Sequence, residues 1–195
     1  TISFTVGRPT FPHDTHKIVG KNGDELPPDT PVELQVKGPC VFSGYFNNPE
    51  ENGKTFASDG FFKTGDIAKI DAKGYITLVG RIKDMINRGG ESISATVIEK
   101  LINTHPSVVS VAVIPMPDPL MGEKTCAYIQ PVDGNELTFE MIIDFLKEQK
   151  ASVLELPERI EFIKAMPYTK AQKLDKRLLK KDVREKLAVE SEGTD

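Results

Sequence analysis

Several short stretches of the sequence place chemically capable side chains beside residues that shape the backbone. Asp66 directly follows a Thr-Gly pair, and its carboxylate has two oxygens that can accept both hydroxyls of a ribose. Arg81 supplies a planar, permanently charged fork suited to ribose or phosphate oxygens. The pair Gly89-Gly90 permits positive φ and a close approach of backbone to ligand. Each feature also has an ordinary explanation: a turn residue, a surface ion pair with Asp84, and a loop before a helix.

Lys173 lies in a strongly basic part of the chain. The segment from Lys164 to Lys186 holds nine Lys or Arg and three Asp or Glu. A positioned ammonium can bridge the two reacting groups when an anionic oxygen attacks phosphorus, and it then stabilises the charge that gathers there. Charge-rich faces are more often simply solvated, so the charge of this segment does not by itself select Lys173.

Length, charge and hydropathy limit the class of protein. A chain of 195 residues with 38% hydrophobic content can form one large domain or two small ones. Its formal charge of -4 does not favour a nucleic-acid partner. No apolar run approaches the roughly 20 residues that a transmembrane helix needs. The first residues lack both a start methionine and the pattern of a signal peptide, which fits a piece excised from a longer protein.

The cysteines and histidines favour neither a disulfide framework nor a metal centre. Cys40 and Cys126 are isolated in sequence, which suits a reducing cytoplasm. His13, His16 and His105 have no Cys or second His pair that would complete a tetrahedral zinc site. We therefore expect a cytoplasmic protein in which this chain binds no metal by itself.

The first 80 residues are expected to form a small, β-barrel-like, all-β unit. Residues 32–36 and 67–70 alternate apolar and polar side chains, as half-buried strands do. Residues 75–79 follow an Asp-Ala-Lys-Gly turn, so they are expected to pair with 67–70 in a hairpin.

The second half changes to the periodicity of alternating helices and strands. Helices are expected to begin after Ser94, Thr138 and Asp175, which are suitable N-caps. Met141 and Leu178 are among the residues expected to face inward from the last two. Strands are expected at 108–114, 125–130 and 159–163. The order predicts a compact α+β domain with a three-stranded sheet.

The whole chain is therefore expected to be α+β, with its division in a short charged joint. The β-rich unit should span 1–82 and the α+β domain 83–189, followed by a flexible tail at 190–195.

Four stretches, taken in order, resemble motifs of the adenylate-forming superfamily of acyl- and aryl-CoA ligases and carrier-loading enzymes. They are VELQVKGPCVFSGYFNNPE at 32–50, FKTGDI at 62–67, GYITLVGRIKDMINRGGESI at 74–93 and LPERIEFIKAMPYTKAQKLDKRLL at 156–179. One such motif occurs easily by chance, whereas four in a fixed order at domain-like spacings are specific. The resemblance implies that the chain is the C-terminal part of such an enzyme.

The resemblance also implies roles for individual residues. Asp66 and Arg81 are expected to bind the nucleotide, with Asp66 on the ATP ribose. Lys83 occupies the hinge about which the C-terminal domain rotates between two working orientations. Gly89 and Gly90 are expected to contact the CoA or phosphopantetheine arm.

Lys173 corresponds to the catalytic lysine of the family, because it follows Pro167 and Thr169 at the family's offset. The resemblance implies that it assists the attack of a substrate carboxylate on ATP. Gln172 is a departure, since the family usually has glycine there, and glycine would let the loop insert closely into the site.

The expected activity is ATP-dependent conversion of a carboxylic acid to an acyl-adenylate, followed by transfer to a thiol of CoA or an acyl-carrier protein. Mg²⁺ should accompany ATP, with the metal ligands, phosphate loop and acid pocket upstream of this chain. The chain alone should therefore be inert, and its uncovered apolar surface favours self-association. A fatty or aryl acid is the main substrate prediction. The first alternative is a dihydroxybenzoate-adenylating enzyme of siderophore pathways, and the second is a non-catalytic nucleotide-binding module.

Overall fold

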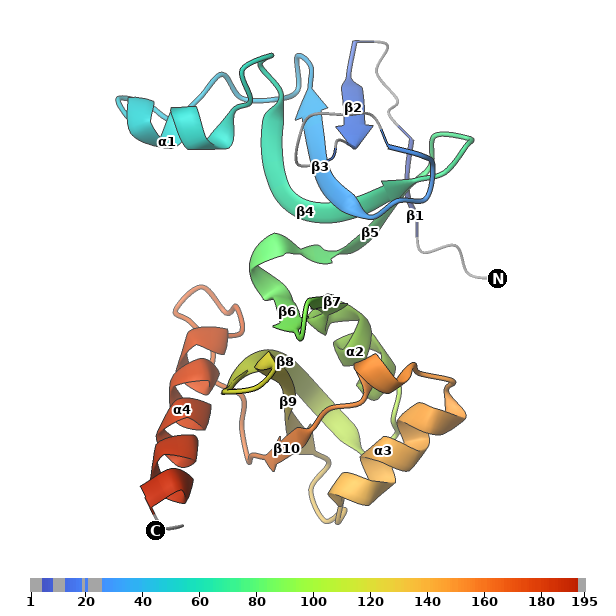
Figure 1. Cartoon of the computed structure of the whole chain (residues 1–195), viewed down its shortest axis with the longest axis vertical. Coiled ribbons are helices and arrows are strands. Elements are labelled where there is room, and N and C mark those ends of the chain that lie inside the picture. The colour runs from blue at the N-terminus through green and yellow to red at the C-terminus, as the bar shows by residue number, and fades with distance from the viewer. Residues whose placement is uncertain (1–4, 9–12, 19, 21–25, 193–195) are drawn as a thin grey trace. The chain divides into compact units, whose positions relative to one another are not determined.

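The computed structural model describes residues 5–8, 13–18, 20 and 26–192, and the chain divides into two compact units between Lys83 and Asp84 (Figure 1). Both units combine strands with helices, so the α+β class is confirmed. None of the helices within the described ranges is both long and apolar enough to cross a membrane.

The first unit is built on one antiparallel sheet with the strand order β1-β5-β4-β3-β2. Its strands are β1 (Thr5–Gly7), β2 (Thr15–Ile18), β3 (Val32–Lys37), β4 (Phe62–Ile70) and β5 (Ile76–Arg81). The hairpin predicted around the Asp-Ala-Lys-Gly turn is confirmed as the β4–β5 pair. The Asp71 carboxylate accepts the backbone N–H groups of Lys73 and Tyr75, which closes the turn.

The prediction that this unit is all-β is wrong, because it contains the helix α1 (Pro49–Thr55). Asn48 caps its first turn through a bond from the Glu51 N–H, and Pro49 begins the helix. Asparagine at the N-cap followed by proline is a helix-start signal that the sequence displays. The helix buries no side chain, so its apolar periodicity gives no signal.

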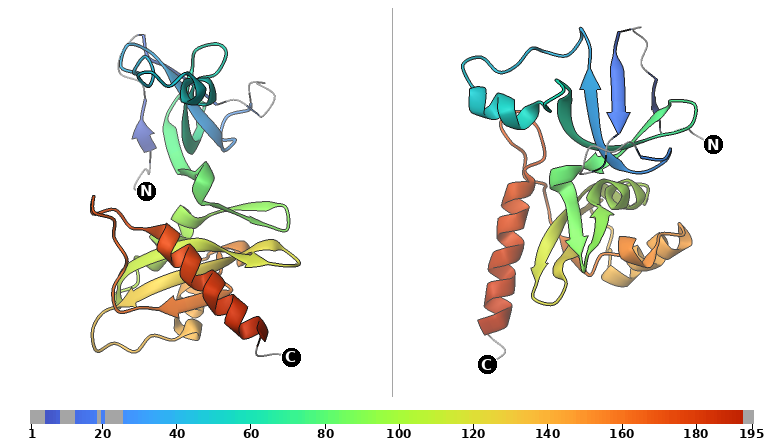
Figure 2. Two further views of the ribbon diagram at one scale, coloured as in Figure 1. Left: turned by 90° about the vertical axis from the view of Figure 1, so that its left-hand side faces the viewer. Right: turned by 45° about the horizontal axis from the view of Figure 1, so that its top comes forward.

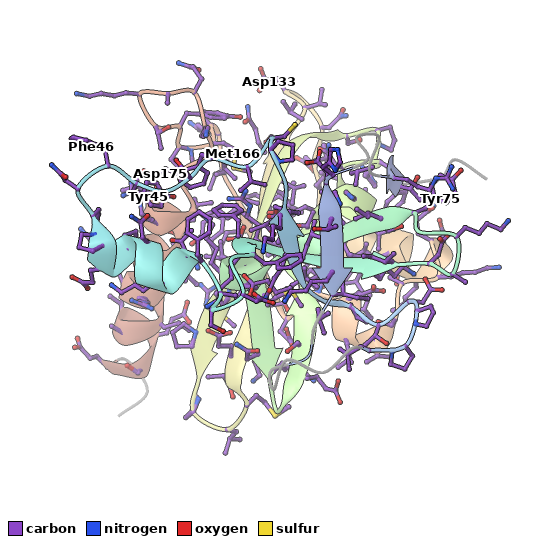
Figure 3. All side chains as sticks on the ribbon, turned by 90° about the horizontal axis from the view of Figure 1, so that it is seen from above. Tyr45, Phe46, Tyr75, Asp133, Met166 and Asp175 are labelled. Atoms are coloured by element: carbon purple, nitrogen blue, oxygen red, sulfur yellow. The ribbon has the colours of Figure 1, made fainter. Side chains whose placement is uncertain are left out.

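Aromatic side chains gather next to α1. Phe42, Phe56 and Phe62 have ring centroids 5.2–5.6 Å apart, and Tyr45 stacks edge-on against Phe42. Phe46, in the segment that leads into α1, is 93% exposed and is labelled in Figure 3.

The second unit contains a five-stranded sheet and three α-helices, rather than the predicted three strands. The strands are β6 (Met85–Arg88), β7 (Glu91–Ser94), β8 (Val108–Asp118), β9 (Gly122–Pro131) and β10 (Arg159–Phe162). The helices are α2 (Ala95–Ile102), α3 (Phe139–Glu148) and α4 (Lys176–Glu192). The two unpredicted strands, β6 and β7, have only four residues each, and a Gly-Gly turn that signals a hairpin joins them.

β8 and β9 pair antiparallel and carry most of the buried side chains of this sheet. Their side chains alternate between two cores. On one face Val113, Ala127 and Ile129 pack with α2 and α3, and on the other Ile114 and Tyr128 pack with α4. A strand covered on both faces reads as a continuous apolar run, which is why residues 108–114 were recognisable. Figure 2 shows α4 lying along the sheet.

The predicted N-caps Ser94 and Thr138 are confirmed, since their hydroxyls accept backbone N–H groups at the third helical residue. Met141 and Leu178 were expected to face inward, but they are 47% and 53% exposed. Each precedes a buried neighbour, and adjacent residues on a helix point about 100° apart, so only one of each pair can face the core.

Polar contacts also fix α4 to the strands β9 and β10. The Tyr128 hydroxyl donates to Asp182 at 2.5 Å, and Lys186 pairs with both Asp182 and Glu161. Arg159 reaches Glu190 at 2.7 Å. Residues 190–192, expected in a flexible tail, are therefore helical, and the remaining residues of that predicted tail lie outside the described ranges.

Candidate functional site

Asp66 and Arg81 face each other across the β4–β5 pair in the first unit. The Arg81 Nε lies 2.8 Å from the Asp66 Oδ1, so the guanidinium pairs with Asp66 and not with Asp84 as the simplest surface explanation expected. Asp66 is 25% exposed and Arg81 is 55% exposed, which leaves both open to a ligand. The pair presents one anionic acceptor and one cationic donor on the same face of a sheet.

A backbone irregularity sets the position of Asp66. The Thr-Gly pair before it was expected to form a tight turn, but it lies inside β4, where the register with β3 shifts. Gly65 has a φ of 71° and donates its N–H to the Glu33 carboxylate. The Thr64 hydroxyl accepts the Asp66 N–H and donates to the Leu34 carbonyl. Such bulges re-aim a side chain, and this one turns Asp66 toward Arg81.

Lys83 is an exposed residue in the short 3-10 turn η1 (Ile82–Asp84). It is the last residue of the first compact unit, so the chain passes from one unit to the other at this position. A short turn at an element boundary is the kind of segment that can absorb changes in φ and ψ.

Gly89 and Gly90 form the two-residue turn of the β6–β7 hairpin rather than a loop before a helix. Arg88 and Glu91 flank the turn as a register pair. The φ angles of the two glycines are 57° and 92°, the pattern of a type I′ turn, which strongly prefers glycine. Gly89 donates its N–H to the Met121 carbonyl at 2.8 Å. The turn is exposed and therefore accessible to a ligand.

Lys173 lies on a tight loop between β10 and α4. The Thr169 N–H donates to the Lys173 carbonyl at 2.7 Å, and the Lys173 N–H donates to the Thr169 hydroxyl. Tyr168 and Leu174 form a β-bridge just outside these bonds. The Lys173 side chain is exposed, so its ammonium projects from a closed backbone loop.

Gln172 has a φ of 57°, the left-handed region that non-glycine residues rarely adopt. Its N–H donates to the Thr169 carbonyl, which fixes this conformation. The glycine that the family resemblance leads one to expect here is thus explained by backbone conformation. A β-carbon at this angle costs about 1–2 kcal/mol.

The ends of this loop are anchored to the rest of the unit. Asp175 donates its backbone N–H to the Pro167 carbonyl, and Figure 3 shows Met166 and Asp175 close together at the two ends. Lys176 forms an ion pair with Glu99 of α2 at 2.8 Å. The same Glu99 oxygen accepts a backbone N–H of β8. Sequence reasoning missed Glu99, because a lone glutamate on a helix gives no sign of its partners.

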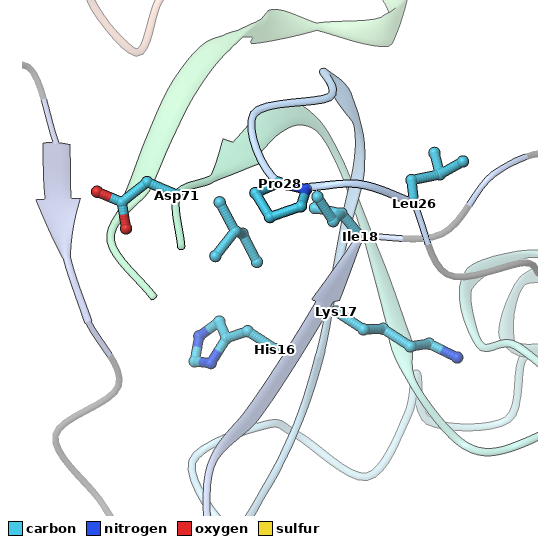
Figure 4. Close-up of a pocket in the computed structure, with 7 residues that line it drawn as sticks. His16, Lys17, Ile18, Leu26, Pro28 and Asp71 are labelled. Atoms are coloured by element: carbon cyan, nitrogen blue, oxygen red, sulfur yellow. The ribbon is translucent and has the colours of Figure 1, made fainter. Parts of the chain in front are cut away.

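The predicted site residues thus form the Asp66–Arg81 pair, the glycine turn and the Lys173 loop, with Lys83 by itself at the boundary between the units. Within the described part of the chain, no hydrogen bond or ion pair joins the turn to the loop. A hollow of about 230 Å³ in the first unit is lined by His16, Ile18 and Pro28, among others (Figure 4). No predicted site residue lines it.

Over the described ranges, no three His, Cys, Asp or Glu side chains converge as a metal site would require. Burial raises the pKa of the Cys126 thiol to about 12, which keeps this core residue protonated and unreactive.

The sequence is similar to a known enzyme family and to individual enzymes. Residues 97–173 match the family described as AMP-binding enzyme C-terminal domain. The chain is 41% identical to enterobactin synthase component E of Escherichia coli over 92% of its length, and 36% identical to 2,3-dihydroxybenzoate-AMP ligase of Bacillus subtilis over 94%. It covers 33% and 34% of these proteins, so it spans about a third of each.

The fold is also similar to part of a solved structure. ATP-bound MatB from Rhodopseudomonas palustris superposes with a TM-score of 0.81 at 32% identity. The superposition covers 92% of this chain and 35% of that protein.

Proposed function

Because this chain belongs to the AMP-binding enzymes, whose C-terminal domain it carries, we propose that it is the C-terminal part of an aryl-acid–AMP ligase. The similarity to enterobactin synthase component E and to 2,3-dihydroxybenzoate-AMP ligase carries the proposal. It supports the dihydroxybenzoate alternative better than the broader prediction of a fatty or aryl acid.

The proposed reaction has two steps. In the first, the carboxylate of the aryl acid attacks the α-phosphorus of ATP, and pyrophosphate leaves. In the second, a thiol attacks the carbonyl carbon of the aryl-adenylate, a thioester forms and AMP leaves. The thiol acceptor is the phosphopantetheine of a carrier protein, or CoA. Mg²⁺ bound with ATP would neutralise negative charge on its phosphates.

Asp66 and Arg81 are the proposed nucleotide-binding pair. Ion pairing with Arg81 orients the Asp66 carboxylate, so that its oxygens can accept the two ribose hydroxyls. The guanidinium retains further N–H donors for oxygens of the ribose or phosphate. An orientation set before binding lowers the entropy lost on binding.

Lys173 is the proposed catalytic residue of the first step. Its ammonium would bridge the attacking carboxylate and the α-phosphate, where negative charge increases in the transition state. The closed Thr169–Lys173 backbone loop limits the positions open to this side chain.

The glycine turn serves the second step in this proposal. Gly89 and Gly90 present backbone without side chains, so the narrow pantetheine arm can approach closely. Rotation at Lys83 would bring the Lys173 loop to the adenylate in one step and the turn in the other.

Acid-dependent exchange of pyrophosphate into ATP tests the proposal in the full-length protein that carries this chain. We expect exchange with 2,3-dihydroxybenzoate or salicylate and little with decanoate. Exchange with decanoate alone would replace the aryl acid by a fatty acid. No exchange with any acid, while ATP still binds, would identify a nucleotide-binding module and refute the ligase.

A further inference from the structure

The tip of the β8–β9 hairpin holds the Gly89–Gly90 turn from the side. Gly89 donates its N–H to the Met121 carbonyl at 2.8 Å, and Asn87 donates its N–H to the Glu123 Oε2 at 2.8 Å. Between these two bonds, Arg88 and Gly122 form the register pair that joins β6 to β9. The turn is therefore connected to the hairpin at three successive residues.

From these contacts we infer that Glu123 is a positioning residue for the Gly89–Gly90 turn, and hence for the thiol-transfer step. This inference rests on the proposed function. Glu123 acts through the Asn87 backbone N–H and has no proposed contact with substrate. A charged acceptor makes a stronger hydrogen bond to a backbone N–H than a neutral acceptor does.

Such support matters at the turn because its hairpin is short, and the core residues Ile86 and Ile93 anchor it two register pairs away from the glycines. β6 and β7 have four residues each, and an isolated two-stranded hairpin is marginally stable in water. Arg88↔Gly122 is the single register pair between β6 and β9. Arg88 also bonds to Glu158, which accepts the Thr125 N–H of β9. Besides the Arg88↔Gly122 pair, the backbone connections nearest the turn are the Asn87–Glu123 and Gly89–Met121 bonds.

The hairpin tip is itself rigidly built. The Asp118 Oδ1 accepts the N–H groups of both Leu120 and Met121, at 3.0 and 2.8 Å. The Asp118 Oδ2 pairs with the Lys124 ammonium at 2.6 Å. These bonds fix the backbone at Met121. The clamp on the turn, formed by the Met121 carbonyl and the Glu123 carboxylate, therefore lies on a tip that is itself hydrogen-bonded.

The Met121 side chain also packs against the first turn residue, whose positive φ already favours glycine. A β-carbon built on Gly89 would lie 2.8 Å from the Met121 Cε, whereas one built on Gly90 would meet no atom within 4 Å. Met121 therefore packs against Gly89, whereas the space beside Gly90 is open, so the Gly90 side is the less crowded approach for a ligand.

Two variants of the full-length protein separate positioning from general damage. Glu123→Ala should raise the KM for the thiol acceptor about tenfold, the effect of one charged hydrogen bond, while pyrophosphate exchange changes less than about twofold. Glu123→Gln retains an oxygen that accepts the Asn87 N–H, so it should recover most of the loss. Glu136→Ala, which removes an exposed carboxylate before α3, is the matched control and should alter neither step.

Amide hydrogen exchange of the 195-residue chain supplies a readout that does not depend on activity. In the Glu123→Ala variant, protection should fall at Asn87 and Gly89 and persist at buried β9 amides such as Ile129. Undiminished protection at Asn87 and Gly89 would contradict the inference that Glu123 holds the turn in position.

Three kinetic results would contradict the inference: an unchanged thiol KM, an equal loss in both steps, or failure of Glu123→Gln to recover activity. A full-length protein without acid-dependent exchange would refute the proposed function and the kinetic part of this inference. The amide measurement would still decide whether Glu123 positions the turn.

Discussion

The Gly89–Gly90 turn and the loop that carries Lys173 contain residues with the same backbone angle but different chemistry. Gly89 and Gln172 both have a φ of 57°. In the turn, the sequence supplies glycine, for which this angle carries no steric penalty. In the loop it supplies glutamine, whose β-carbon makes the same angle costly.

The two segments also differ in what holds them. The turn is bound to a neighbouring hairpin through Met121, Gly122 and Glu123. The loop is closed mainly by its own Thr169–Lys173 bonds and is anchored beyond its end by the Lys176–Glu99 pair. The turn is therefore fixed from outside, whereas the loop depends on local bonds that must offset its own backbone strain. The loop should therefore open at a lower free energy than the turn.

The largest expected effect concerns the Lys173 side chain. Lys173→Ala should slow acid-dependent pyrophosphate exchange by a factor of about 10²–10³, because one positioned donor to a transition state typically contributes that much. Lys170→Ala, in the same exposed loop, is the matched control and should change the rate little. Exchange that survives Lys173→Ala would remove Lys173 from the catalytic role.

Substitution at the glycine turn tests the external clamp. Gly89→Ala should lower the free energy of unfolding by about 1–2 kcal/mol, through its positive φ and the displacement of Met121. In a double-mutant cycle with Met121→Ala, the steric part should appear as a coupling of about 0.5–1 kcal/mol.

Gly90→Ala combined with Met121→Ala is the control cycle, because no atom lies within 4 Å of a β-carbon at Gly90. Its two effects should be additive within about 0.5 kcal/mol in urea unfolding. Equal coupling in both cycles would show that Met121 has no specific contact with Gly89.

Replacement of glutamine in the loop should reduce the difference between the two segments. Gln172→Gly should raise the free energy of unfolding by about 0.5–1 kcal/mol, since relief of the left-handed strain exceeds the added entropy of the unfolded chain. Ala171→Gly adds the same entropy at a neighbouring exposed position without positive φ, so it should destabilise. Thermal unfolding of both variants would decide, and a loss for Gln172→Gly would contradict the strain argument.

The smallest effect is a pH dependence at the hairpin tip. The hydrogen bond from Lys124, followed by that from the Met121 N–H, lowers the pKa of Asp118 below its ordinary value of 3.8. Since the folded pKa is lowered, the carboxylate contributes stability above pH 3.8, and this contribution is lost as the pH falls through the folded pKa.

Asp118→Asn should therefore reduce stability at pH 6 and flatten its decline between pH 4 and 2, in unfolding curves measured across this range. Asp175→Asn offers the comparison from the Lys173 loop, because the Arg177 hydrogen bond similarly lowers the pKa of Asp175. Protection of the Gly89 amide should respond to Asp118→Asn and not to Asp175→Asn.

Much of the second unit was predictable because its signals are local. The apolar run at 108–114 reflects burial of the strand on both faces of the sheet. The caps Ser94 and Thr138 satisfy N–H groups in the first turn of the helix that follows them, so the signal lies within a few residues. β6 and β7 were missed because four-residue strands have too little periodicity. α1 was missed because it has no buried face.

For the site, the sequence by itself determined which residues are candidates. The order of the four motifs selected Asp66, Arg81, Lys83, Gly89, Gly90 and Lys173, since motif spacing is a property of the chain alone. Even the significance of Gln172 was visible there, as a residue where glycine is expected. Their roles in ATP and thiol chemistry are the proposals made above.

Only the tertiary structure decided which partners hold these candidates. The Arg81–Asp66 pair, the Glu123 bond to Asn87 and the Glu99 bond to Lys176 join positions 15, 36 and 77 residues apart. The physical reason is that a charged side chain has several possible counter-charges or backbone donors in the sequence. Strand register and helix packing bring one particular partner within 3 Å. Neither the register nor the packing follows from sequence spacing alone.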